Sequence, residues 1–217
     1  MIRYSVVVLL AALSGACALT SRSEPIPMRY FSADASQRSA PSVRGDLSGL
    51  SLRLERVRSS SHLGEPIAYR TSEHELGYYD EERWTEQPEA FLERGLERAL
   101  FQERRVTRVM GGASESLAVE LVAFEEVRGP QPIARVEAIV TLHDERAAHL
   151  EQTIRVERPI STEAGKDPTL RTVAALSAAL DTAVEQIADL VSQRLQVLAA
   201  KEPAAAAEPS SAAAAVR

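Results

Sequence analysis

The chain has little cysteine, little lysine and few aromatic residues, and each shortage excludes a class of protein. Its single cysteine, Cys17, cannot form an internal disulfide, so a hydrophobic core rather than a disulfide framework must stabilise the fold. Lysine occurs only at Lys166 and Lys201, and the formal net charge is −6. Because a mildly acidic chain without a dense basic patch binds nucleic acid poorly, we expect no nucleic-acid partner.

Long apolar runs are scarce as well. The run from Ser5 to Leu13 is shorter than the roughly 20 residues that span the ~30 Å core of a bilayer. Arg3 precedes this run, and the small residues 14–16 follow it, which is the order of segments in a secretory signal peptide. We therefore expect residues 1–16 to be cleaved off, which removes Arg3 and leaves a side-chain charge of −7.

Cys17 directly follows the expected cleavage point. This arrangement resembles a bacterial lipobox, although Ser14 stands where leucine is usual. The resemblance implies a diacylglycerol on the Cys17 thiol and an N-acyl chain, such as palmitate, on its amino group. Because each buried CH₂ contributes about 0.8 kcal/mol, two or three chains would hold the protein on a membrane. The alternative is a plain secretory leader in which Cys17 is an unmodified thiol.

Composition divides the remaining chain into a body and two flanking segments. Residues 17–27 contain serine, arginine and two prolines and are expected to form a tether behind the lipid. Residues 28–200 contain the regular apolar patterns of a single folded domain. Residues 201–217 are rich in alanine, proline and serine, and we expect this tail to be disordered because it cannot bury enough apolar surface.

Alternation of apolar and polar residues predicts strands on both sides of one helix. A polar stretch, 72–75, is typical of a hairpin tip, and the last three strands are separated by turns that suit an antiparallel meander. The expected strands are 28–31, 50–55, 67–70, 76–79, 106–110, 117–127, 134–142 and 150–157.

Helical spacing of apolar residues predicts two helices, 89–103 and 168–198. Pro88 suits the start of the first, and Asp167 is expected to cap the second. Gly95 either lets another element approach the first helix or weakens it. The resulting fold class is α+β, an antiparallel sheet with two helices packed on one face, which makes a two-layer sandwich.

The stretch from residue 68 to residue 96 carries the most specific pattern in the chain. Together with the leader, Cys17 and the long last helix, it resembles the ABC-type transport auxiliary lipoprotein family, to which the lipoprotein of the paraquat-inducible system belongs. The residues that carry the resemblance are Tyr30, Ala68, Tyr69, Arg70, Glu75, Leu76, Tyr78, Tyr79, Arg83, Trp84, Pro88, Glu89, Phe91, Leu92 and Leu96.

This resemblance implies a non-catalytic role in lipid transport across the periplasm. The implied partners are a substrate-binding protein of the mammalian-cell-entry type and an ABC permease, and self-association into a homo-oligomer stays open. Ala18 follows Cys17 where aspartate would retain a lipoprotein in the inner membrane, so we expect the periplasmic face of the outer membrane. The rival hypothesis is a structural or assembly-factor lipoprotein of the envelope without a transport role.

The partner-binding candidates are Tyr69, Arg70, Tyr78, Tyr79, Arg83 and Trp84. The alternative for Trp84 is that it packs under the first helix. Tyr78 and Tyr79 should point to opposite sides of a strand, so one of them should be buried. The two arginines are expected to pair across the hairpin with Glu75, Glu81 or Glu82.

No sequence pattern indicates catalysis or a metal site. The histidines lie outside any HExxH pattern and lack partners at ligand spacing, so we expect solvated loop residues at His62, His74, His143 and His149. Neither a Gly-x-Ser-x-Gly elbow nor a phosphate-binding lysine is present. We expect no cofactor and no enzyme, with ATP hydrolysis left to a partner. A lipid-handling enzyme would require the fold to assemble a site, for instance His143 near a serine and an aspartate.

Overall fold

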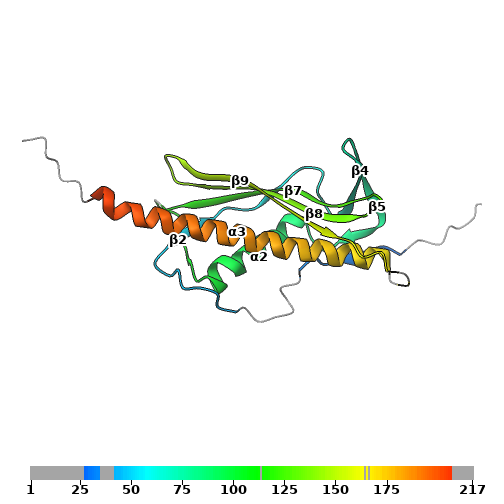
Figure 1. Ribbon diagram of the computed structural model, residues 1–217, viewed down its shortest axis with the longest axis horizontal. Coiled ribbons are helices and arrows are strands. Elements are labelled where there is room, and N and C mark those ends of the chain that lie inside the picture. Colours follow the sequence, from blue (N-terminus) through cyan, green and yellow to red (C-terminus); the bar gives the residue numbers. More distant parts are fainter. Residues whose placement is uncertain (1–26, 35–41, 113, 164, 166, 207–217) are drawn as a thin grey trace, which may run out of the picture.

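In the computed structural model, one long helix lies along a face of a large sheet (Figure 1). The structure describes residues 27–34, 42–112, 114–163, 165 and 167–206. Cys17, the expected signal peptide 1–16 and most of the tether lie outside the described residues, as does 207–217 of the tail. Within the described part, no helix has both the length and the apolar composition of a membrane span.

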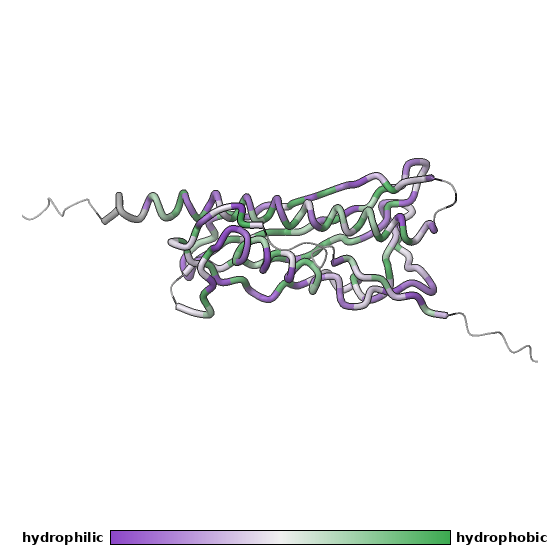
Figure 2. Tube along the Cα trace, turned by 90° about the horizontal axis from the view of Figure 1, so that it is seen from below, coloured by the Kyte–Doolittle hydropathy of each residue, from purple (hydrophilic) through white to green (hydrophobic). Residues whose placement is uncertain are grey.

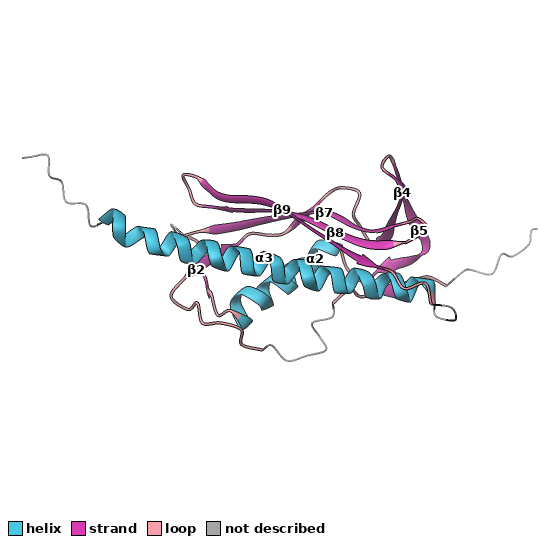
Figure 3. Cartoon of the chain, in the orientation of Figure 1, coloured by secondary structure: helices cyan, strands magenta, loops and turns pink. Residues whose placement is uncertain are grey.

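Three helical segments and nine strands follow one another along the described residues (Figure 3). The strands are β1 Arg29–Phe31, β2 Ser51–Leu54, β3 Arg58–Ser59, β4 Pro66–Ser72, β5 Glu75–Trp84, β6 Thr107–Arg108, β7 Ser116–Val127, β8 Ile133–His143 and β9 Ala148–Pro159. The helices are α2 Pro88–Glu97, the π-helical η3 Arg98–Glu103 and α3 Pro168–Ala206.

Strands β7, β8 and β9 form the expected antiparallel meander. Alternate residues of β8 are buried, and they face α3 together with apolar residues of β7 and β9. The period-2 pattern in the sequence therefore identified both the strands and their buried side correctly. The buried residues of β8 are Ala134, Val136, Ala138, Val140 and Leu142.

The sheet is mixed, so the expectation of a purely antiparallel sheet is wrong. The second edge of β7 pairs in parallel with β2, β3 and β4 in turn, and β1 is parallel to β5. Parallel strands need a long crossover, and here the chain passes through β5, α2, η3 and β6 before it enters β7. Alternation in the sequence shows which residues form a strand but not which strand lies beside it.

The second helix has the expected N-cap and extends further than expected. The Asp167 carboxylate accepts hydrogen bonds from the backbone N–H groups of Thr169 and Leu170, at 2.9 and 3.4 Å. The Arg29 guanidinium, 2.5 Å away, and these N–H groups hold the pKa of Asp167 below its usual value. The helix continues to Ala206, into the segment expected to be disordered, and this extension includes Pro203.

The core lies between α3 and the sheet. Apolar and polar residues alternate along the turns of α3 (Figure 2), and most of the apolar ones are buried, whereas Leu170 and Val197 are exposed. Helix α2 lies on the same side of the sheet and contacts α3. The expected placement of both helices on one face is therefore confirmed for this part of the sheet. The buried residues of α3 include Leu176, Leu180, Val184, Ile187, Val191 and Leu195.

Gly95 marks the point where α2 meets α3 most closely. A Cβ atom built at Gly95 would lie 2.7 Å from Cγ2 of Val184. Real Cβ atoms do not approach other atoms so closely, and the β-branched valine is stiff. Of the two roles open for Gly95 in the sequence, the structure supports the close approach of another element.

We predict that Gly95→Ala destabilises the protein although alanine is the better helix former by about 1 kcal/mol. Overpacking at this contact should lower the free energy of unfolding by ~1–3 kcal/mol. Urea unfolding followed by the fluorescence of Trp84, the only tryptophan, measures the effect.

The matched control is Val184→Ala, alone and combined with Gly95→Ala. If the two side chains clash, the double variant loses less stability than the sum of the two single losses. Additive losses would show that the contact does not limit the packing of α2 on α3.

Candidate functional site

The β4–β5 hairpin carries the residues that the sequence suggests for partner binding. Tyr69 on β4 lies opposite Gly77 on β5, and β4 also pairs with the end of β7. A Cβ atom at Gly77 would lie 2.5 Å from Cζ of Tyr69, so only glycine lets this ring lie over the strand. We call the following set the hairpin surface, because it lines a shallow hollow of about 320 Å³: Tyr69, Tyr78, Tyr79, Asp80, Glu81, Glu82 and Arg128.

An arginine from outside the hairpin organises its aromatic residues. The Arg128 guanidinium lies 3.3 Å from the centroid of the Tyr69 ring and 5.0 Å from that of Tyr79. The two tyrosine rings meet edge to face, with centroids 5.8 Å apart. A cation over such faces contributes about 0.5–1 kcal/mol where it is exposed, so the contact orders the rings more than it stabilises the fold.

The Tyr79 hydroxyl is fixed by a buried carboxylate. It donates a hydrogen bond of 2.6 Å to Glu126, and the same carboxylate accepts one of 3.1 Å from Arg128. Burial, followed by the bond to Glu126, raises the pKa of Tyr79, so the hydroxyl stays protonated and remains a donor. Tyr79 is therefore the buried member of the tyrosine pair.

Tyr78 is the exposed member, as the alternation along a strand requires. Its side chain is 40% accessible, and its hydroxyl donates to the backbone carbonyl of His62 at 2.9 Å. Asp80, Glu81 and Glu82 follow on the same strand. The hairpin surface therefore presents an aromatic ring beside carboxylates, a combination suited to a partner with a basic and partly apolar surface.

The arginines of the hairpin do not make the ion pairs expected across it. Arg70 instead holds Glu125 of β7 with two hydrogen bonds, of 2.7 and 3.1 Å. Glu125 is 1% accessible, and the bond to it raises the pKa of Arg70. Arg83 donates to the backbone carbonyls of Tyr79 and Glu82. Arg70 therefore fixes the hairpin to β7, and Arg83 fixes β5 within the hairpin.

Trp84 lies in the core and not on the hairpin surface. It is 1% accessible and packs against Phe124 of β7 and Phe91 of α2, with ring centroids 5.0 and 6.0 Å apart. The packing alternative for Trp84 matches this position, and the burial leaves no accessible ring for a partner. A change at Trp84 would act on docking through the fold.

The histidines occupy different environments. His74 is exposed at the hairpin turn, as expected. The expectation of a solvated loop residue is wrong for His149, which lies on β9 with a side chain that is only 20% accessible, beside Glu115 and Asp144. His143 ends β8, with Nε2 3.3 Å from a carboxylate oxygen of Glu55. His62 is half-buried in the loop before β4.

Sequence patterns did not identify Glu125, Glu126 and Arg128 as parts of the site. These residues lie at the end of β7, about 50 residues after the hairpin, and reach it only because β4 pairs in parallel with β7. The sequence contains one signal that could have identified the two glutamates. Adjacent glutamates within a strand of apolar residues need buried partners, and arginines are the residues that supply them.

Comparison with solved structures supports the fold. Protein XCC0632 from Xanthomonas campestris, described as a member of family DUF330, aligns with a TM-score of 0.64 and 19% identity over 79% of this chain and 99% of its own. A second, uncharacterised protein aligns with a TM-score of 0.57 and 16% identity over 76% of this chain and 99% of its own. No curated protein matches the chain.

A family model shows to which family the chain belongs, which the similarity of the fold alone does not. The model of the ABC-type transport auxiliary lipoprotein component matches residues 32–188. This range contains the whole hairpin, all of β7 to β9 and the first half of α3. The chain therefore belongs to the family of ABC-type transport auxiliary lipoproteins.

Proposed function

We propose that the protein is the accessory lipoprotein of an ABC-type lipid transporter of the mammalian-cell-entry class, and that it couples the substrate-binding shuttle to the outer membrane. The observation that carries this proposal is the family match over residues 32–188. In this role the chain contributes anchoring and docking, and the permease and its ATPase contribute the energy of transport.

The position of the N-terminal strand supports a docking role for the hairpin surface. Strand β1 pairs with β5, with Tyr30 opposite Arg83. The tether of residues 17–27 spans at most roughly 40 Å when fully extended. An anchor at Cys17 would therefore hold the start of β1 within that distance of the membrane, and the hairpin surface would lie on the neighbouring strands, where a shuttle protein could meet it.

We predict that Tyr78→Ala weakens capture of the mammalian-cell-entry protein or permease from detergent-solubilised envelope. The loss should be about tenfold, which corresponds to ~1.4 kcal/mol, because exposed aromatic rings are frequent binding hot spots. Tyr78→Phe keeps the ring and should retain capture.

Met110→Ala is the control for exposure alone, because Met110 is 83% accessible and lies near β6, away from the hairpin. The wild-type chain at native expression should recover the shuttle or the permease. Recovery of neither would argue for the structural or assembly role, and equal capture by Tyr78→Ala would remove the hairpin surface from the proposal.

We also predict that Cys17→Ala moves the protein from the membrane fraction to the soluble periplasmic fraction. The reason is that two or three acyl chains would supply the membrane affinity of the wild type. Mass spectrometry of the N-terminal peptide should find the diacylglyceryl thioether, and density-gradient separation should place the wild type in the outer membrane. An unacylated wild-type Cys17 would contradict the anchor.

A further inference from the structure

A second group of polar residues gathers at the opposite end of the sheet from the hairpin. Glu115 directly precedes β7, Asp144 begins the turn after β8, and His149 is the second residue of β9. The antiparallel meander brings these three positions to one edge, since Ser116 lies opposite His143 and His143 opposite Ala148. Residues separated by up to 34 positions in the sequence thus become neighbours.

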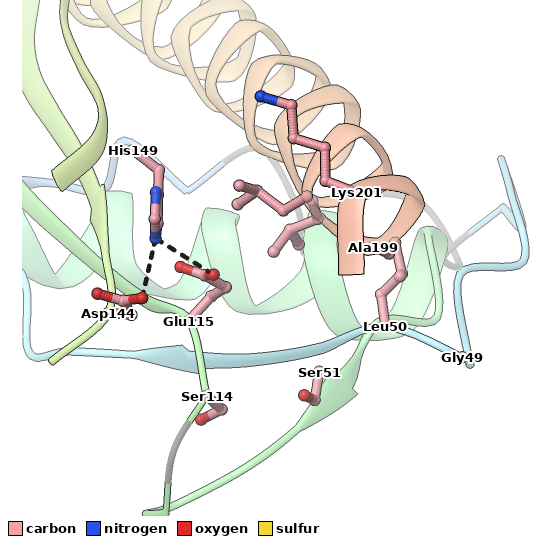
Figure 4. A pocket seen from close by; sticks show the side chains of 11 residues that line it. Gly49, Leu50, Ser51, Ser114, Glu115, Asp144, His149, Ala199 and Lys201 are labelled. Atoms are coloured by element: carbon pink, nitrogen blue, oxygen red, sulfur yellow. Dashed lines mark ion pairs between the residues drawn. The ribbon is translucent and has the colours of Figure 1, made fainter. Parts of the chain in front are cut away.

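The three side chains converge on one point. Figure 4 shows the His149 ring directed at both carboxylates. Nε2 of His149 lies 3.2 Å from Oδ2 of Asp144 and 3.6 Å from Oε1 of Glu115. Ligands of a tetrahedral zinc ion at 2.0–2.2 Å lie ~3.3 Å from one another. The observed separations therefore match those of adjacent ligands around one ion.

Unpartnered polar atoms gather at the same place. Oε2 of Glu115 and Oγ of Ser114 are buried, and neither makes a hydrogen bond within the described part of the chain. Ser114, Glu115 and His149 line a pocket of about 410 Å³, which Leu195, Leu198 and Lys201 of α3 also line. Figure 4 shows Lys201 on α3 across the pocket from Ser114. Buried polar atoms without partners are rare in proteins, and a bound ion or water is the usual explanation.

Backbone hydrogen bonds fix the orientation of the Asp144 carboxylate. Oδ1 of Asp144 accepts hydrogen bonds from the N–H groups of Arg146 and Ala147, at 2.6 and 2.7 Å, while Oδ2 faces His149. One oxygen of Asp144 is therefore fixed by the backbone, and the other lies beside His149, where it is available to a cation.

We propose that Glu115, Asp144 and His149 form a binding site for a divalent transition-metal ion of the zinc type. Imidazole and carboxylate together suit Zn²⁺ better than Mg²⁺, which prefers oxygen ligands alone. Three protein ligands leave one coordination position toward the pocket. The bound ion would link the start of β7 to the β8–β9 turn and relieve the unpartnered atoms.

The test is a titration of the full-length purified protein, without a histidine tag, after treatment with a chelator. We expect saturable binding of one Zn²⁺ per chain by calorimetry, and no comparable binding of Mg²⁺. The melting temperature should rise by roughly 5–10 °C at a Zn²⁺ concentration a hundredfold above Kd.

The variants Glu115→Gln, Asp144→Asn and His149→Ala should each weaken binding by at least ~10–100-fold. The first two keep the shape of the side chain, so they remain informative if His149→Ala fails to fold. The matched controls are His143→Gln, at the neighbouring strand end, and His74→Gln, at the exposed turn, and both should bind like the wild type.

Two results would overturn the site. If the wild type binds no Zn²⁺, direct pairing of His149 with the two carboxylates accounts for the cluster instead. If His149→Ala and Asp144→Asn bind Zn²⁺ with wild-type affinity, the ion sits elsewhere on the chain. Neither result bears on the capture of transport partners, so this inference fails or survives separately from the proposed function.

Discussion

The burial of α3 against β7, β8 and β9 is the contact on which the rest of the structure depends. Each large apolar side chain of α3 gains about 1.5–3 kcal/mol from this burial, whereas the propensity of an isolated helix is marginal. The helix spans both ends of the sheet. Near its start, Asp167 and Thr169 bond to Arg29 of β1 and Glu82 of β5, and near its end Leu195 and Leu198 line the pocket beside His149. One packed helix therefore holds the hairpin and the acidic pocket in fixed relation.

Strand β7 complements the helix as the central strand. Its first edge pairs with β8 along almost its whole length, and its second edge pairs in turn with β2, β3 and β4. The two proposed sites lie at its two ends: Glu115 directly precedes the strand, and Glu125 lies near its end, where it pairs with β4. Ten residues of strand separate these positions by ~33 Å. A metal ion at one end would therefore not take part in contacts at the hairpin surface, and would act on the partner only through the stability of the sheet.

The sequence predicted the elements well and their neighbours poorly, for a physical reason. Alternation and helical spacing report which residues share one side of an element, and this was enough for the β7–β9 meander, for α3 and for the opposite orientations of Tyr78 and Tyr79, although not for which of the two is exposed. Parallel pairing of β4 with β7 depends on a crossover through the whole middle of the chain, which leaves no local pattern. The partners of Arg70 and of His149 come from distant strands in the same way. The family resemblance, carried mainly by the hairpin residues, was confirmed, because the family model matches residues 32–188 and this range contains the whole hairpin.

The buried polar contacts of the hairpin bear most directly on docking. Arg70 donates hydrogen bonds to Glu125, and Tyr79 and Arg128 both donate to Glu126. Both faces of the hairpin are therefore fixed to the end of β7. Buried ion pairs of this kind contribute little net stability. The loss of one partner, however, leaves an unpaired buried charge and strongly lowers the stability of the fold. Their effect here is to hold β5 in one orientation, with the Tyr78 ring outward. A rigid surface loses little conformational entropy when a partner binds. If the hairpin surface is the docking site, as proposed, binding there would cost less conformational entropy than binding by a mobile loop of the same composition.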